Sequence, residues 1–149
     1  MKSPSKHNVL FLCTGNSCRS QMAEGFARYL GSDVIQAYSA GTHPVGINPK
    51  AIQVMEEIQI DMSSQSSKSV EAIDLDKMDL VVTLCGDAAE HCPVLPQRIV
   101  RAHWGLEDPA RFKGPEELVL GKFRETRDLI CSFVKQLIED VRREGDSQP

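Results

Sequence analysis

Reactive residue types gather in one short stretch near the N-terminus, C13-T14-G15-N16-S17-C18-R19-S20, which directly follows an apolar run. Gly15 and its small neighbours allow the backbone to turn so that successive N–H groups converge, which creates a concave site for an anion. Arg19 could hold two oxygens of a tetrahedral oxyanion in a bidentate grip. Cys13, at the start of the turn, would then face the central atom of that anion.

The same N–H groups and the Arg19 guanidinium would stabilise a thiolate, which makes Cys13 a candidate nucleophile at neutral pH. Ser20 could donate a further hydrogen bond to the sulfur. Cys18 needs no chemistry in this scheme, and we expect it to pack at the start of the following helix. The alternative is an ordinary turn with a buried cysteine. The strand, glycine and helix around the Cys13-to-Arg19 spacing argue against it.

A second pair of cysteines lies in T83-L84-C85-G86-D87-A88-A89-E90-H91-C92-P93. Cys85 and Cys92 could meet if the segment between them rearranges, and thiol–disulfide exchange would then be their use. A purely hydrolytic enzyme needs no such pair. A zinc site is disfavoured because structural zinc sites use shorter paired spacings. Cys131, on the apolar side of the last predicted helix, is expected in the core.

The elements that would position these residues alternate between strand and helix. Apolar runs predict strands at 9–12, 34–40, 79–84 and 98–104, and amphipathic patterns predict helices at 19–30, from 49, at 70–75 and from 116 to about 141. Asn48 and Pro49 are typical of a helix start. The outer face of the first helix is expected to carry Gln21, Glu24 and Arg28.

Alternation of this kind predicts an α/β fold. We expect a single three-layer domain with a four-stranded parallel sheet, helices on both faces and the phosphate (anion-binding) loop after the first strand. Ligands of such sheets bind at the carboxyl ends of the strands, where Cys13, Cys85 and Asp108 are predicted to lie. The domain should span residues 1–149, with 1–7 and 142–149 as flexible tails.

Length and composition exclude several classes. A chain of 149 residues with 41% hydrophobic and 26% charged residues is an ordinary globular domain. A net charge of −4 argues against a nucleic-acid or anionic-membrane surface. The apolar run near the N-terminus is too short for a signal peptide, and no run approaches the roughly 20 residues of a membrane span. We therefore expect a cytoplasmic monomer.

Three motifs carry a resemblance to a known family. The stretch from Cys13 to Ser20 is similar to the phosphate loop of the low-molecular-weight protein tyrosine phosphatases and of the thioredoxin-coupled arsenate reductases, which share one fold. The 83–93 segment resembles the redox segment of the reductases, and H103-W104-G105-L106-E107-D108-P109-A110 resembles their acid loop. The phosphatases usually carry aromatic residues after the Asp-Pro pair, where this chain has Ala110 and Arg111. The resemblance therefore favours the reductases.

The resemblance implies a mechanism for arsenic detoxification. Cys13 would attack arsenate, and Asp108 would protonate the departing oxygen. Cys85 would then attack Cys13 and expel arsenite, and Cys92 would attack Cys85, which leaves a Cys85–Cys92 disulfide for thioredoxin to reduce. Residues 86–91 are predicted to be mobile. Phosphate and sulfate would compete for the site, and side phosphatase activity is expected. The implied substrate-binding residues are Thr14, Gly15, Asn16, Ser17, Cys18, Arg19 and Ser20.

The resemblance requires no cofactor, but some reductases of the family bind a potassium ion. The residues that correspond to its ligands are Asn16, Glu24 and Ser39. Lys68 stands where that pattern often has a carboxylate, so its ammonium is expected either to replace the cation or to be solvated in its loop.

Two other functions stay open at this stage. A low-molecular-weight protein tyrosine phosphatase would use Cys13, Arg19 and Asp108 for hydrolysis. A non-catalytic oxyanion or redox sensor would report oxidation through Cys85 and Cys92.

Overall fold

The computed structural model describes residues 6–85 and 95–146 of the chain. The helices and strands in this part are β1 (His7–Cys13), α1 (Arg19–Gly31), β2 (Ile35–Gly41), α2 (Pro49–Glu56), β3 (Leu80–Thr83), β4 (Arg101–His103) and α3 (Glu116–Asp146), with the 3₁₀ helices η1 (Val70–Ala72), η2 (Leu75–Lys77) and η3 (Pro109–Arg111). Within the described residues, no helix is long and apolar enough to cross a bilayer.

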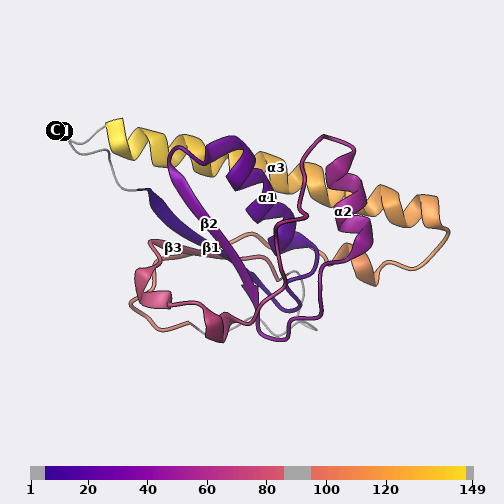
Figure 1. Ribbon diagram of the computed structural model, residues 1–149, viewed down its shortest axis with the longest axis horizontal. Coiled ribbons are helices and arrows are strands. Elements are labelled where there is room, and N and C mark those ends of the chain that lie inside the picture. The colour runs from indigo at the N-terminus through magenta and orange to yellow at the C-terminus, as the bar shows by residue number, and fades with distance from the viewer. Residues whose placement is uncertain (1–5, 86–94, 147–149) are drawn as a thin grey trace.

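The strands form one sheet in the order β2-β1-β3-β4, and each neighbouring pair is parallel (Figure 1). This confirms the predicted four-stranded parallel sheet. Because the strands run in the same direction, Cys13, Thr83 and His103 end their strands at one edge. Register places Cys13 beside Gly41 of β2 and Leu12 beside Thr83 of β3.

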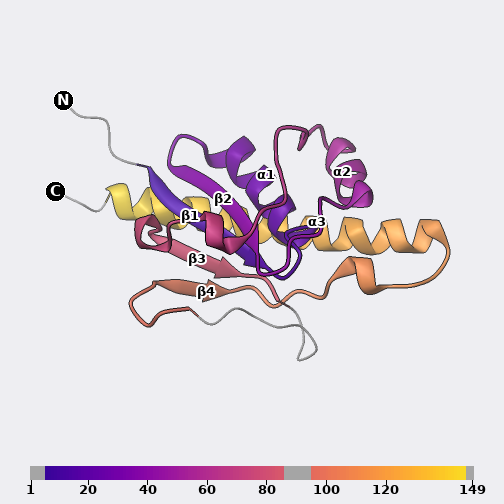
Figure 2. The ribbon, with the colours of Figure 1, turned by 60° about the horizontal axis from the view of Figure 1, so that its bottom comes forward.

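The two faces of the sheet are covered by different kinds of helix. All three α-helices lie on one face (Figure 2), where Phe11 of β1 shares a buried core with Phe26 of α1 and Phe123 of α3. The other face is covered by η1, η2 and the segment around Leu95 and Ile99, which pack over Leu10 and neighbouring residues. Helices thus lie on both faces as predicted, but those on the second face are short 3₁₀ turns.

Local signals placed most element starts correctly. The Asn48 side chain accepts a hydrogen bond of 2.8 Å from the Lys50 N–H, so it caps α2 as expected. The predicted helix at 70–75 is instead two 3₁₀ helices, because Asp74 caps a new turn through the Asp76 N–H. β4 begins at Arg101, since residues 96–99 form a turn in which the Ile99 N–H donates to the Pro96 carbonyl.

Both predicted tails include residues that belong to regular elements in the structure. His7 already belongs to β1, and its N–H donates to the Val34 carbonyl at 2.8 Å. α3 continues past Val141 to Asp146, and the Arg142 guanidinium lies 2.9 Å from the Asp33 carboxylate before β2. The sequence after Val141 is polar, so it has no apolar stripe that would predict a helix. An exposed helix end that is stabilised by an ion pair needs no such stripe.

Candidate active site

The loop after β1 is held from outside through its carbonyl groups. Four successive carbonyl oxygens each accept a hydrogen bond from a donor beyond the loop. These bonds are Thr14 O from His43 N at 2.8 Å, Gly15 O from Val45 N at 3.1 Å, Asn16 O from Gln21 Nε2 at 3.1 Å, and Ser17 O from Asn48 N at 3.1 Å.

Outward carbonyls have a consequence for the N–H groups. In a trans peptide the C=O of one residue and the N–H of the next point in opposite directions. The N–H groups of Gly15, Asn16, Ser17 and Cys18 are therefore turned to the inner side of the loop. Asn16 adopts a left-handed φ of 47°, which allows the tight turn. This is the predicted anion-binding arrangement of backbone donors.

A cavity of about 490 Å³ lies on this inner side. It brings together the three residues that the sequence analysis placed at its centre, Cys13, Arg19 and Asp108. Its other lining residues are Thr14, Gly15, Ser17 and Cys18 from the loop, His43, Val45 and Asn48 from the segment after β2, and Ala110 and Arg111 from η3. Among the predicted substrate-binding residues, Asn16 and Ser20 lie behind the loop rather than on the cavity wall.

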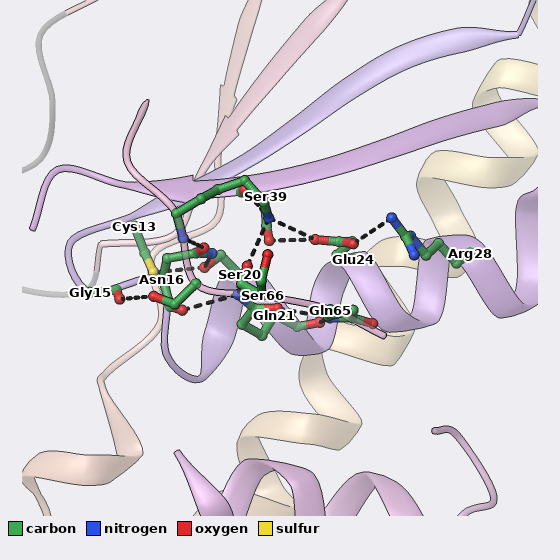
Figure 3. Close-up of polar contacts among 12 residues, drawn as sticks. Cys13, Gly15, Asn16, Ser20, Gln21, Glu24, Arg28, Ser39, Gln65 and Ser66 are labelled. Carbon is green, nitrogen blue, oxygen red and sulfur yellow. Dashed lines mark hydrogen bonds and ion pairs between the residues drawn. The ribbon is translucent and has the colours of Figure 1, made fainter. Parts of the chain in front are cut away.

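Ser20 contacts the Cys13 sulfur from behind. The Cys13 Sγ and Ser20 Oγ atoms are 2.9 Å apart, and the Asn16 side-chain amide donates to the same Ser20 oxygen at 2.9 Å (Figure 3). The hydroxyl has one proton and two lone pairs, so it can donate to a Cys13 thiolate while it accepts from Asn16. A thiolate at Cys13 would be stabilised by it.

Cys18 is a different kind of thiol, although it also borders the cavity. Burial raises the pKa of Cys18 to about 12, and the negative charge of Asp108 adds to the effect. Its side chain is 3% exposed and belongs to the main hydrophobic core. It therefore stays a neutral packing residue at physiological pH.

Arg19 ties three segments together at the cavity. It is 3% exposed, and its Nη1 donates to the Leu84 carbonyl at 3.0 Å and to the Leu106 carbonyl at 2.7 Å. Its Nη2 lies 3.9 Å from the Asp108 carboxylate. The Asp108 side chain also caps η3 by accepting from the Ala110 N–H at 3.0 Å. These contacts hold Arg19 and Asp108 at the cavity that Cys13 also borders.

Trp104, near the start of the acid loop, packs against two other aromatic rings. The Trp104 ring packs against Phe11 at a centroid distance of 5.8 Å and stacks on Phe133 at 5.1 Å. Trp104 thus packs between β1 and α3, and it is not among the described residues that line the cavity.

Cys85 lies near the site, but it is not among the described residues that line the cavity. It is 3% exposed and directly follows Leu84, whose carbonyl is bonded to Arg19. Cys92 and the segment that was predicted to be mobile, 86–91, lie outside the described residues. Cys131 is half-buried against the main core on α3.

A buried polar cluster lies behind the loop, where the sequence suggested a cation site (Figure 3). The Glu24 carboxylate is 2% exposed and accepts a hydrogen bond of 2.5 Å from Ser39 Oγ. Arg28 Nη2 contacts its other oxygen at 3.0 Å. The Lys68 ammonium donates to the Ser39 and Ser66 carbonyls at 3.1 and 2.8 Å and lies 4.0 Å from Glu24. The Lys68 side chain is 32% exposed, so its ammonium lies at the edge of this cluster.

The prediction that Gln21 and Glu24 lie on an outer helix face was wrong. Gln21 is 0% exposed and Glu24 is 2% exposed, because residues 60–68 pack over that face of α1. Sequence reasoning also missed the cavity residues His43, Val45 and Arg111. No local pattern marked them, since they reach the cavity only when loops from separate parts of the chain meet there.

Comparison with known proteins decides the family. Residues 8–147 match the family model described as low molecular weight phosphotyrosine protein phosphatase. The chain belongs to this family. The family resemblance inferred from the three motifs is thus confirmed.

Similar members of the family include arsenate reductases. The arsenate reductase of Bacillus subtilis (strain 168) is 49% identical over 131 residues, which cover 88% of this chain and 94% of that protein. A solved arsenate reductase in the phosphate binding state has a TM-score of 0.75 and 38% identity, and the match covers 91% of this chain and 98% of that one. A low molecular weight protein tyrosine phosphatase from T. tengcongensis has a TM-score of 0.69 and 27% identity over 91% of this chain and 99% of that one.

Proposed function

We propose that the protein is an arsenate reductase whose nucleophile is Cys13. One observation carries the proposal: inward N–H groups, a thiol with a hydroxyl donor, Arg19 and Asp108 converge on one cavity. The arsenate reductases among the relatives support the choice of oxyanion.

The first step is substitution at arsenic. Backbone N–H groups and Arg19 bind the oxyanion. The Thr14 hydroxyl is buried and has no hydrogen-bond partner among the described residues, so it is a further donor to the anion. The Cys13 thiolate forms an S–As bond while an As–O bond breaks, and Asp108 protonates the departing oxygen, which leaves as water.

The second step moves two electrons to arsenic. The Cys85 thiolate attacks the Cys13 sulfur, so that an S–S bond forms while the S–As bond breaks and its electron pair stays on arsenic. Arsenate is thereby reduced to arsenite and two thiols are oxidised to a disulfide. Cys92 then attacks Cys85 and releases the Cys13 thiolate. A dithiol protein, which we propose is thioredoxin, reduces the Cys85–Cys92 disulfide. This cycle needs reduced thiols, so we place it in the cytoplasm.

Phosphate monoester hydrolysis is the second candidate function. The same cavity accepts any tetrahedral oxyanion, and Cys13, Arg19 and Asp108 are sufficient for hydrolysis. The segment after Asp108 favours reduction, since Ala110 and Arg111 offer no aromatic wall for an aryl ester. We therefore expect phosphatase activity only as a side reaction.

One assay tests the proposal. Thioredoxin, thioredoxin reductase and NADPH are mixed with the protein with and without arsenate, and hydrolysis of an aryl phosphate is followed in parallel. NADPH consumption that depends on arsenate supports a reductase. Hydrolysis without arsenate-dependent consumption would instead indicate a phosphatase, and neither activity would indicate a sensor.

The variant Cys85→Ala separates the two chemistries. It should abolish steady turnover of arsenate, because the S–As adduct then has no attacking thiol, while aryl phosphate hydrolysis continues. The matched variant Cys131→Ala, on α3, should retain both activities. Equal loss of both activities in Cys85→Ala would reject the division of roles between Cys13 and Cys85.

We also propose that the Lys68 ammonium replaces a potassium ion in the polar cluster behind the loop. It contacts the Ser39 carbonyl and the Glu24 carboxylate, which belong to two of the three residues that correspond to the ligands of the cation. Replacing sodium chloride by potassium chloride at equal ionic strength should leave wild-type thermal stability unchanged. In Lys68→Ala, potassium should stabilise more than sodium. A wild-type protein that potassium stabilises over sodium would contradict the proposal.

A further inference from the structure

Gln21 is an amide buried in the first turn of α1. It is 0% exposed, and it is not among the described residues that line the cavity. A buried amide is costly unless its donors and acceptor are bonded. The Gln21 Nε2 donates to the Asn16 carbonyl at 3.1 Å and to the Ser66 carbonyl at 3.0 Å. Its Oε1 accepts from Gln65 Nε2 at 2.9 Å, so both polar atoms of the side chain are used.

These bonds fix the orientation of the amide. Two carbonyl oxygens face Nε2, and only an N–H donor satisfies them. Gln65 also donates to the Gln21 backbone carbonyl at 2.9 Å, which holds the partner segment against α1. The Gln21 side chain thus links the phosphate loop to residues 65–66 through hydrogen bonds (Figure 3).

The Asn16 carbonyl, which accepts a hydrogen bond from Gln21, lies at the tightest point of the loop. Asn16 has a left-handed φ of 47°, a conformation that L-residues adopt at some cost. If the peptide between Asn16 and Ser17 flipped, through changes in ψ of Asn16 and φ of Ser17, the Asn16 oxygen would turn into the cavity. An oxygen there would repel an oxyanion, and the Ser17 N–H would be lost as a donor.

The other carbonyls of the loop are held by backbone donors. Thr14 O is bonded to the N–H of His43, and Ser17 O to the N–H of Asn48. Among the four, Asn16 O alone is held by a side chain without a backbone donor, so one substitution can remove its bond without altering the backbone of the neighbouring segment.

We propose that Gln21 is a positioning residue that keeps the Asn16–Ser17 peptide turned so that the Ser17 N–H faces the bound oxyanion. The inference rests on the oxyanion site of the proposed function. It does not depend on which reaction follows, because binding of inorganic phosphate already requires this N–H group.

The test uses Gln21→Met, which keeps the length and volume of the side chain but donates nothing. The dissociation constant for inorganic phosphate is measured by calorimetry on the fully reduced full-length protein, beside thermal unfolding. We expect affinity to fall about tenfold, as for a lost donor to a charged ligand. Ile130→Val, a buried change on α3, is the matched control that lowers stability without touching the loop.

Amide NMR supplies the signature that a merely structural role would not give. In the wild type, phosphate should shift the Gly15 and Ser17 amide signals alike. In Gln21→Met the Ser17 response should largely disappear, while that of Gly15 persists because His43 still holds the Thr14 carbonyl.

Each outcome decides the inference. Wild-type phosphate affinity in Gln21→Met, or an unchanged Ser17 response, would overturn it. If Gln21→Met does not fold, Gln65→Met is tested in its place. We expect this variant to bind phosphate about threefold more weakly, and an unchanged affinity would also overturn the inference. A wild-type protein that does not bind phosphate would overturn the oxyanion site itself, which distinguishes that failure from the failure of the Gln21 role.

Discussion

At the scale of single residues, two cysteines five positions apart have opposite properties. The Cys13 sulfur lies 2.9 Å from the Ser20 hydroxyl and borders the same cavity as Arg19. Both thiols are buried in the main core, and burial raises the pKa of Cys18 to about 12. Position within the loop, and not residue type, therefore distinguishes the candidate nucleophile from the packing thiol.

This difference predicts the labelling pattern. With a pKa of about 12, only about 1% of Cys18 is thiolate at pH 10, so iodoacetamide should not modify it in the native protein. Cys13 should be modified at neutral pH, and phosphate should protect it. Peptide mass spectrometry after timed labelling measures both, with urea-unfolded protein as the control in which both thiols react. Native labelling of Cys18 at pH 8 as fast as Cys13 would contradict the assignment.

At the scale of elements, the phosphate loop depends on the end of β2. Gly41 lies so close to the loop that a Cβ atom there would be 2.5 Å from the Thr14 carbonyl oxygen and 2.8 Å from the Asn16 nitrogen. Both atoms are backbone, and they cannot move aside without distorting the loop. The segment that follows then supplies the N–H donors of His43 and Val45.

Gly41→Ala should therefore weaken both stability and phosphate binding. Overpacking against backbone is expected to lower the free energy of unfolding by about 1–3 kcal/mol. Gly121→Ala is the matched control, because nothing lies within 4 Å of a Cβ atom at that position on α3. It should raise stability by up to about 1 kcal/mol and leave phosphate binding unchanged. Urea unfolding and calorimetry measure the two effects. Wild-type stability in Gly41→Ala would show that the loop tolerates displacement.

At the scale of the whole molecule, α3 joins the helices to the acid loop. Arg127 of α3 donates to the Val54 carbonyl and to the Glu57 carboxylate at 2.9 Å, and Arg124 contacts Glu57 at 2.7 Å. Phe133 stacks on Trp104, which directly follows β4 and precedes Asp108 by four residues. The long helix thus contacts both the end of α2 and the segment after β4.

The Glu57 contacts predict an acid-sensitive stability. The hydrogen bond from Arg124, with that from Arg127, lowers the pKa of Glu57 from its ordinary value of 4.5. A lowered pKa in the folded state gives stability that is present above pH 4.5 and is lost as the pH falls through the lower folded value. Glu57→Gln should melt at a lower temperature than the wild type at pH 7.

The gap between the two melting curves should close as the pH falls below 4.5. Glu56→Gln, at the neighbouring exposed position, serves as the control and should show a smaller gap at every pH. A gap for Glu57→Gln that stays constant from neutral to acidic pH would mean that the ion pairs do not contribute through the charge of Glu57.

The sequence alone determined the parallel sheet, the turn with Cys13 and Arg19, and the cap at Asn48. Each follows from a local pattern: a short apolar run, a glycine between a strand and a helix, or an Asn before a Pro. Such signals act over a few residues, so they survive without knowledge of the rest of the fold. The family resemblance also came from contiguous motifs.

Only the tertiary structure decided what surrounds that turn. Gln21 and Glu24 have the polar types of an outer helix face, and they are buried because residues 60–68 fold over them. The donors from His43 to Asn48, and the Lys68 N–H that donates to the Asn16 side chain, reach the loop only after β2 pairs with β1. Such contacts depend on chain segments that are distant in sequence, and no local pattern encodes which of them will meet. The candidate nucleophile could be predicted from the turn itself, whereas the groups that orient the N–H donors of the turn are set by the packing of the whole domain.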